Sequence, residues 1–287
     1  MEKKDLFIQK IQKMFGPRHV RILQHMYTRP PLTFRVNTEK VNKNDALREL
    51  RKQRFSIKPG PLDNSYIVLN EPENLRLSQT DLFNQGKIYI QNLSSMVPVF
   101  MLGPQEGEKI LDMCAAPGSK TSQMSVITKQ NAQIVAVDNN KKRVYKLEDN
   151  LNRQGVKNVE VIYGTAVGLE KRYELFNQYF DKVLLDAPCS NEGLIILTEP
   201  KTFEYWNPKK PRSLSKLQKK LISSAISMLA PGGHLVYSTC TFSKEENEDI
   251  VIWTLSRFKN VSLLEVKKIL PDGLFTGFFA AKFVKLE

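Results

Sequence analysis

The sequence lacks any apolar run that approaches the roughly 20 residues of a membrane-spanning helix, so we expect no membrane segment. Its first residues, MEKKDLFIQK, contain no apolar core of a secretory signal. Cysteine is scarce as well, with three in 287 residues, which excludes a disulfide scaffold and suits a reducing compartment. We therefore expect a cytoplasmic protein whose free thiols can act as nucleophiles.

Histidine is equally scarce, and His19, His25 and His234 make no cluster. A zinc site needs about four ligands at short spacing, whereas Cys189 and Cys240 are 51 residues apart. A cysteine protease needs a histidine base, but His234 begins the apolar stretch that Cys240 ends, so the two would lie at opposite ends of one strand. We expect neither a metal site nor a protease.

Acidic residues are too few to balance the basic ones, which leaves a net charge of +13 and a pI near 9.5. Residues 1–60 carry 15 Lys/Arg against 5 Asp/Glu, and residues 201–220 carry seven against Glu204 alone. A basic excess confined to particular segments is expected of a protein that binds a phosphate backbone. We predict a nucleic-acid partner rather than a charged face that only aids solubility.

From Ile88 onward, short apolar stretches alternate with amphipathic helical ones. This alternation is typical of an α/β fold with a doubly wound, mostly parallel sheet covered on both faces, here of seven strands. The last two stretches indicate an antiparallel edge. The predicted strands are 110–113, 134–138, 159–162, 182–186, 234–238, 261–266 and 277–283, and the predicted helices between them are 119–129, 141–153, 214–229 and 245–258.

The first part of the chain mixes helix and strand signals within a small span. Residues 5–15 and 44–54 have helical spacing, and residues 32–37 and 66–69 are typical of strands. We therefore predict a basic N-terminal α/β subdomain over residues 1–84, whose charge suits nucleic acid, followed by a larger α/β domain over residues 85–287.

The motif MCAAPGSKT at residues 113–121 joins a strand to a helix N-terminus, where open α/β sheets bind cofactors. A phosphate-binding P-loop fails because Cys114 and Ser119 occupy the glycine positions, and a dinucleotide fingerprint fails because only Gly118 is present. A nucleoside cofactor without a pyrophosphate needs fewer glycines. Asp138 ends the next strand, 20 residues after Gly118, where an acid binds ribose hydroxyls or caps the following helix. S-adenosyl-L-methionine fits this topology.

Two further predicted strands end in DAPCS and YSTC, which bring Asp186, Cys189 and Cys240 to the same cleft. Methylating C5 of a pyrimidine needs a thiol and a carboxylate of this kind, because C5 is a poor nucleophile. A thiolate that adds to C6 turns the ring into an enamine, and a carboxylate near N3 and N4 stabilises the adduct. The thiol needs a polar or cationic setting, and the base must leave any stack to reach it.

These motifs resemble those of the Nop/Sun family of RNA cytosine-5 methyltransferases. The similarity is closest at MCAAPGSKT, LLDAPCS and YSTCTFSKEENE, with weaker similarity at FRVNT and IQNLSSMVP. The resemblance implies that Cys240 attacks C6, that Cys189 assists product release, and that Asp186 and Lys120 line the cytosine pocket. In that family the N-terminal segment helps bind RNA, so the resemblance implies an RNA-binding subdomain over residues 1–84 and a catalytic domain over residues 85–287. It also implies that the cofactor is held by Cys114, Ala115, Ala116, Pro117, Gly118, Ser119, Lys120, Asp138, Thr165 and Asp186.

Two positions depart from the family pattern. Thr165 follows a strand after which the family usually has an acid for the adenine, so it serves through its hydroxyl or leaves cofactor binding weaker. Asn191 stands where the family favours Gly or Ala, beside the residues of product release. We expect a monomer that methylates tRNA or rRNA. Two alternatives are a non-catalytic RNA-binding or ribosome-assembly factor, and a DNA methyltransferase in which the Pro-Cys thiol of Cys189 attacks.

Overall fold

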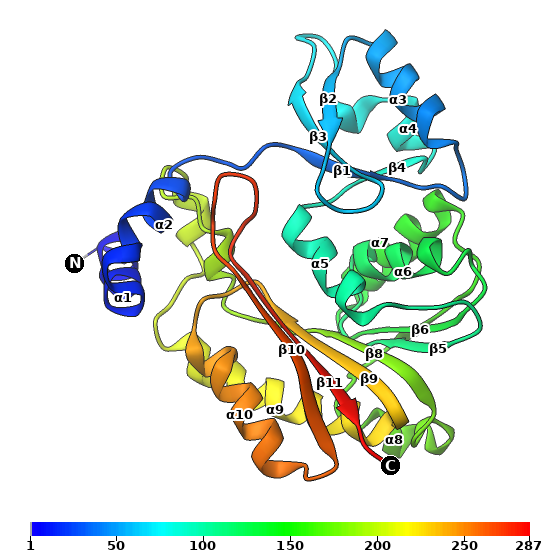
Figure 1. Cartoon of the computed structure of the whole chain (residues 1–287), viewed down its shortest axis with the longest axis vertical. Coiled ribbons are helices and arrows are strands. Elements are labelled where there is room, and N and C mark those ends of the chain that lie inside the picture. The colour runs from blue at the N-terminus through cyan, green and yellow to red at the C-terminus, as the bar shows by residue number, and fades with distance from the viewer. Residues whose placement is uncertain (1) are drawn as a thin grey trace.

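Two β-sheets organise the chain, for which the computed structural model describes residues 2–287 (Figure 1). The larger sheet is the one predicted from the alternating pattern. Its strands are β5 (Lys109–Asp112), β6 (Gln133–Asp138), β7 (Val159–Tyr163), β8 (Phe180–Asp186), β9 (Leu229–Thr239), β10 (Val261–Ile269) and β11 (Phe278–Lys285). Their order across the sheet is β10-β11-β9-β8-β5-β6-β7. The predicted α/β fold class is therefore confirmed.

The strand directions place a topological switch between β5 and β8. Strand β5 pairs in parallel with β6 on one side and with β8 on the other, and β9 continues the parallel set beyond β8. Strand β11 runs antiparallel to both β9 and β10, so the expected antiparallel element is inserted near the edge. The carboxyl ends of β5 and β8 therefore open onto one crevice, which is where open α/β sheets bind ligands.

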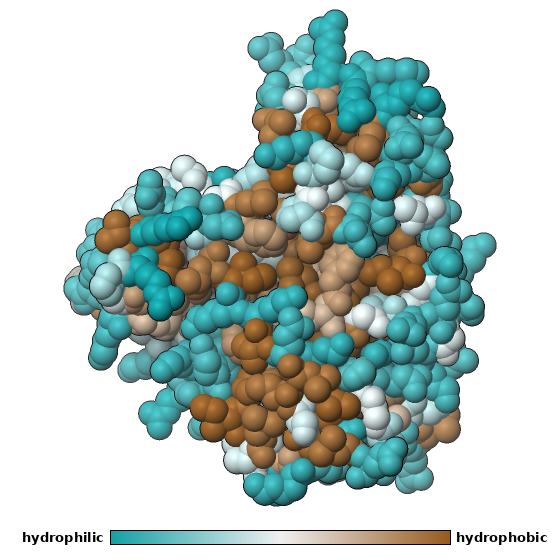
Figure 2. All heavy atoms as spheres, in the orientation of Figure 1, coloured by the Kyte–Doolittle hydropathy of each residue, from teal (hydrophilic) through white to brown (hydrophobic). Residues whose placement is uncertain are grey.

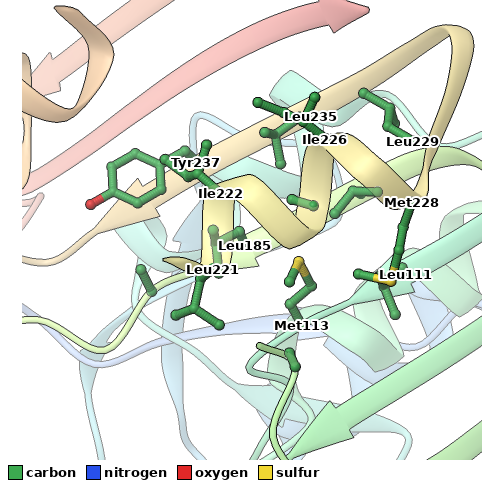
Figure 3. Packing of buried hydrophobic residues seen from close by; sticks show 14 of the residues in the cluster. Leu111, Met113, Leu185, Leu221, Ile222, Ile226, Met228, Leu229, Leu235 and Tyr237 are labelled. Carbon is green, nitrogen blue, oxygen red and sulfur yellow. The ribbon is translucent and has the colours of Figure 1, made fainter. Parts of the chain in front are cut away.

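Alternate residues of the strands feed two apolar cores, one on each face of the larger sheet. Helices α5 (Leu93–Leu102), α6 (Ser119–Ile127) and α7 (Lys141–Gln154) cover one face, and α8 (Leu169–Arg172), α9 (Lys210–Met228) and α10 (Glu248–Arg257) cover the other. Figure 3 shows Leu221, Ile222 and Ile226 of α9 packed against the strands. Each such side chain contributes about 1.5–3 kcal/mol when it is fully buried.

The smaller sheet and two N-terminal helices lie apart from one another. Four antiparallel strands in the order β2-β3-β1-β4 form the smaller sheet, and α3 and α4 pack with it. In the space-filling view, the N-terminal helices and the smaller sheet form two lobes with a notch between them (Figure 2). The elements are α1 (Lys3–Phe15), α2 (His19–His25), β1 (Thr33–Val36), α3 (Lys43–Lys52), β2 (Ser56–Pro59), β3 (Ser65–Asn70), α4 (Asp81–Asn84) and β4 (Ile88–Ile90).

The end of the first subdomain was predicted at residue 84, which is the last residue of α4, yet β4 still belongs to the smaller sheet.

Helix α5, which follows β4, was not predicted from the sequence. Its segment LSSMVPVFML is apolar all round and has no amphipathic period. Within residues 2–287, no helix combines the length and apolarity that crossing a bilayer requires.

The helix predicted over 245–258 is interrupted at its start. A short 3₁₀ turn over Lys244–Glu246 precedes α10, and Asn247 between them adopts φ −120° and ψ −95°. Thr239 Oγ1 donates to Asn247 Oδ1 at 2.5 Å, and Asn247 Nδ2 donates to the carbonyl of Thr241 at 2.9 Å. The helix is broken here because Asn247 is bonded to the loop that carries Cys240.

Candidate active site

The turn after β5 exposes the N-terminus of α6 at the carboxyl edge of the larger sheet. Ala115 N donates to the carbonyl of Val137 at 3.0 Å, which ties the turn to the neighbouring strand. Gly118 adopts φ +97°, and a Cβ at this position would lie 2.8 Å from Leu147 Cδ1. Only glycine combines this conformation with this close approach. The first turn of a helix has N–H groups without a partner inside the helix, and such groups can bind a ligand.

Asp138 ends β6 and is almost completely buried. Its Oδ2 accepts a hydrogen bond from Ala116 N at 3.2 Å, and its Oδ1 accepts one from Asn140 N at 3.0 Å. The N-cap of α7 is Asn140, whose side chain accepts from Arg143 N. Asp138 therefore holds the turn, and the helix-cap role predicted for it is wrong because Asn140 caps α7. Its predicted role in binding ribose hydroxyls stays a prediction.

A small cavity opens beside this turn. Three residues predicted to hold the cofactor, Cys114, Asp138 and Thr165, contribute to its wall. The sequence analysis missed the other lining residues, which are Met113, Asn139, Arg143, Ala166, Pro188, Leu217 and Leu221. The wall thus combines an acid, an exposed hydroxyl and apolar side chains, as a nucleoside requires.

Arg143 is the least expected of these residues. Its Nη1 lies 3.4 Å from Asp138 Oδ2, and its Nη2 donates to the carbonyl of Ala116. Thr165 is exposed, and its Oγ1 accepts from Val167 N at 3.2 Å. The Arg143 guanidinium therefore offsets the negative charge of the buried Asp138 carboxylate. The Thr165 hydroxyl accepts one hydrogen bond and still has its own proton to donate to a ligand.

Lys120 and Asp186 form an ion pair next to the cysteines. Lys120 Nζ donates to Asp186 Oδ2 and to Ser95 Oγ, both at 2.7 Å, and Ser238 Oγ donates to Asp186 Oδ1 at 2.7 Å. The Lys120 side chain is only 8% exposed, whereas that of Asp186 is 30% exposed. The pair therefore presents a partly open carboxylate to anything that enters the cleft. Sequence reasoning predicted both charged residues but not Ser95 or Ser238.

The two thiols meet at the ends of β8 and β9. Cys189 Sγ and Cys240 Sγ lie 3.2 Å apart, and Cys240 N donates to Cys189 Sγ at 3.3 Å. Both thiols also donate to Asn191 Oδ1, Cys240 at 2.9 Å and Cys189 at 3.4 Å. Asn191 has φ 58°, a left-handed conformation that Gly adopts freely and that Asn tolerates better than most residues. This conformation explains why Asn can stand at this position.

The two cysteines differ in burial. Cys189 is buried, while Cys240 is partly exposed. The hydrogen bond with the Cys240 thiol, together with burial, raises the pKa of Cys189 well above its ordinary value. Cys189 therefore remains a neutral thiol at neutral pH, and a neutral thiol is a poor nucleophile.

Two buried glutamates hold the loops that carry these cysteines. Glu246 accepts from Ser190 N at 3.0 Å, from Ser190 Oγ at 2.5 Å and from Gln218 Nε2 at 3.0 Å. Burial raises the pKa of Glu246. The other glutamate, Glu192, is fully buried and also bonds across the two loops. The sequence did not indicate that either glutamate is buried, because a Glu in a polar stretch is usually exposed to solvent.

Asp112 is a further buried acid, at the end of β5. Thr121 Oγ1 donates to its Oδ2 at 2.8 Å, and burial raises the pKa of Asp112 to about 7. Burial likewise raises the pKa of the nearby Cys114 thiol, which suits a structural role better than a nucleophilic one. Among residues 2–287, no three His, Cys, Asp or Glu side chains form a group able to hold a metal ion.

Solved structures of other proteins resemble this fold over nearly the whole chain. A methyltransferase homologue from Pyrococcus horikoshii is 33% identical, with a TM-score of 0.86 and coverage of 98% of this chain and 95% of that one. NSun6 from Pyrococcus horikoshii, solved with SFG, is 26% identical, with a TM-score of 0.86 and coverage of 98% of both chains. The fold is thus that of a Rossmann-like methyltransferase.

The sequence also matches two family descriptions. The one for "16S rRNA methyltransferase RsmB/F" covers residues 99–283, and the one for the ferredoxin-like domain of such proteins covers residues 5–76. Ribosomal RNA small subunit methyltransferase F of Cronobacter sakazakii is 34% identical over 252 residues, which are 84% of this chain and 50% of that relative. The chain belongs to the RsmB/F methyltransferase family, which confirms the resemblance noted in the sequence.

The chain spans about half the length of the curated relatives it matches. The family is one of S-adenosyl-L-methionine-dependent methyltransferases, which confirms the cofactor predicted from the sequence.

Proposed function

We propose that this chain transfers a methyl group from S-adenosyl-L-methionine to C5 of a cytosine in ribosomal RNA, through a covalent bond between Cys240 and C6 of the base. The observation that carries the proposal is the meeting of the two thiols, 3.2 Å apart, at the sheet edge that also holds the Lys120–Asp186 pair. The names of the relatives, which are ribosomal RNA small subunit methyltransferases, support ribosomal RNA as the substrate.

The residues around the cavity fit the cofactor. Asp138 would accept hydrogen bonds from ribose hydroxyls, the N–H groups at the start of α6 would face its polar end, and the Thr165 hydroxyl would contact the adenine. Met113 and Leu221 supply apolar walls for the base. When bound, S-adenosyl-L-methionine supplies an electrophilic methyl group on a sulfonium.

Cys240 acts as the nucleophile. Its thiol gives its proton to solvent, and the thiolate sulfur forms a bond to C6 while the electrons of the C5–C6 double bond move to C5. C5 would take the methyl group as the bond from that methyl to the cofactor sulfur breaks, and the bonding electrons would stay on the sulfur as a neutral thioether. Loss of the C5 proton to a base and breakage of the S–C6 bond then restore the ring and return the thiolate. Asp186, paired with Lys120, would hold the N3 and N4 edge of the cytosine during these steps.

The difference between the thiols supports Cys240, rather than Cys189, as the nucleophile. Burial and the contact with Cys240 keep Cys189 protonated, whereas Cys240 is partly exposed to the cleft. This difference argues against the chemistry of DNA methyltransferases, in which the thiol at the Cys189 position would attack. Cys189 would instead act when the product leaves, because it lies beside the sulfur that must be expelled.

The assignment is tested by transferring labelled methyl groups to small-subunit ribosomal RNA. Cys240→Ala is expected to abolish transfer, and DNA oligomers are expected to accept no label from the unchanged protein. Binding of the RNA by Cys240→Ala is the control for folding, and it is expected to match that of the unchanged protein. Full methylation activity of the Cys240→Ala variant would contradict the proposal.

Thr165 favours a second candidate, a non-catalytic RNA-binding or assembly factor that retains the fold. Thr165 lines the cavity where an acid is the usual adenine partner, and a single hydroxyl replaces that charge. Calorimetric titration with S-adenosyl-L-methionine separates the two candidates, because only the enzyme must bind it. The paired cysteines and Asp186 favour the enzyme, since RNA binding alone requires none of them.

A further inference from the structure

The N-terminal helices lie against the segment that follows the Cys189 loop, not against the smaller sheet (Figure 1). Phe7 of α1 makes edge-to-face contacts with Phe203 at 5.9 Å and with Trp206 at 5.4 Å between ring centroids. Lys3 Nζ donates to the carbonyl of Glu204 at 2.8 Å. The start of the first basic segment therefore contacts the second basic segment at residues 203–206.

Lys10 extends from the same helix to the two loops that carry the cysteines. Its Nζ lies 2.5 Å from Glu192 Oε1 and donates to Ser243 Oγ at 2.6 Å. The Glu192 side chain has no exposed surface, and that of Lys10 is 21% exposed. Glu192 lies three residues after Cys189, and Ser243 lies three residues after Cys240. One ammonium group on α1 thus contacts both cysteine-bearing loops.

Glu192 gathers further donors from around the site. Trp206 Nε1 donates to its Oε1 at 3.1 Å, while Ser243 Oγ and Thr241 Oγ1 donate to its Oε2 at 2.9 Å and 3.2 Å. The loops are also joined directly, because Gly193 N donates to the carbonyl of Cys240 at 2.9 Å. Within residues 2–287, Lys10 is the one side chain bonded to Glu192 that carries a full positive charge.

We infer that Lys10 is a positioning residue that couples the N-terminal helices to the spacing of the two catalytic thiols. This inference rests on the proposed function. A buried ion pair adds little net stability but fixes geometry, and the loss of one partner leaves an uncompensated charge. Without Lys10, Glu192 must take up a proton or move toward water, and either change shifts the loops that hold Cys189 and Cys240.

Lys13 gives a matched comparison on the same helix, because it is exposed to solvent whereas Lys10 is directed inward. Lys10→Met and Lys13→Met each remove one positive charge from α1. Removing a charge that attracts the phosphate backbone raises KM for RNA in both variants by a similar factor. A difference in kcat between the two variants therefore isolates what Lys10 does to the loops.

The test measures kcat and KM for methylation of small-subunit ribosomal RNA by the full chain. Lys10→Met is expected to have a kcat at least tenfold below that of Lys13→Met, with KM values within about threefold of each other. Lys10→Arg, which keeps the charge, is expected to restore kcat to within about threefold of the unchanged protein. Adding Glu192→Gln to Lys10→Met is expected to recover at least fivefold, because no buried charge remains.

Equal kcat values for Lys10→Met and Lys13→Met would overturn the inference. Hydrogen–deuterium exchange of peptides covering 189–194 and 240–247 gives an independent readout that needs no methylation. Faster exchange in both peptides of Lys10→Met alone supports the coupling, and unchanged exchange overturns it. Failure of the proposed function appears elsewhere, as an active Cys240→Ala variant, so the two failures are distinguishable.

Discussion

Replacing Asp186 by Asn separates what the Lys120–Asp186 pair does for folding from what it does for chemistry. The substitution keeps the shape of the side chain and an oxygen for Ser238 Oγ, but it removes the charge that faces Lys120 at 2.7 Å. Lys120 is 8% exposed, so its ammonium would be left buried, with a hydrogen bond to Ser95 and the Phe278 ring near it but no carboxylate paired with it.

The structure sets the size of the effect. Breaking a buried ion pair costs roughly 3–5 kcal/mol, and because the Asp186 side chain is 30% exposed, water reduces this to about 2–3 kcal/mol. For a chain of this size the melting temperature should fall by about 3–5 °C. Methylation should fall by about 10²–10³-fold, because a group aimed at the developing charge of the base is lost.

The control is the double variant Asp186→Asn with Lys120→Met, which removes both charges. Its melting temperature is expected to recover most of the loss, since no unpaired ammonium remains, while methylation stays low. Circular dichroism and methyl transfer on the same preparations measure the two quantities. A single variant that melts within about 1 °C of the unchanged protein, or a double variant less stable than either single one, would refute the reasoning.

Two further predictions follow from the other acids and from Asn191. Burial raises the pKa of Asp112 to about 7, so its contribution to stability is present below about pH 4 and is lost as the pH rises through 7. In urea unfolding, Asp112→Asn should therefore raise the free energy of unfolding by up to about 4 kcal/mol at pH 8, and by much less at pH 5. Equal effects of the substitution at both pH values would contradict this prediction. Asn191→Asp places a carboxylate 2.9 Å from Cys240 Sγ, where it repels the thiolate. Methylation of RNA and alkylation of Cys240 should therefore both slow at least tenfold in this variant. Asn191→Gly is the control, because glycine keeps the loop conformation without adding a charge. Equal alkylation rates in the Asp and Gly variants would disprove that repulsion.

The sequence was sufficient for the larger sheet because its strands are short apolar runs closed by turn residues. Strands β5 to β11 fall where the alternation predicts them, and the carboxyl ends of β8 and β9 carry the two cysteines. Strand order in such a sheet brings these ends together. Helix α5 was missed because a segment buried on all sides has no period to detect.

The interior partners of the site could not be read from the sequence. Glu192, Glu246 and Lys10 belong to residue types that are usually exposed, and nothing in the local sequence marks the two glutamates as buried or Lys10 as their neighbour. Lys10 and Glu192 are 182 positions apart, so only the packed fold brings them together. The sequence flagged Asn191 as unusual, but its contact with both thiols depends on the left-handed turn and on the neighbouring strand.

The covalent bond between Cys240 and cytosine C6 is tested most directly by trapping it. Cys189→Ala, incubated with S-adenosyl-L-methionine and labelled small-subunit ribosomal RNA, is expected to accumulate a protein–RNA adduct that shifts on a denaturing gel. The double variant Cys189→Ala with Cys240→Ala is expected to give no shifted band, because the attacking sulfur is gone. An adduct that persists in the double variant, or a Cys189→Ala variant that turns over normally without one, would contradict the account.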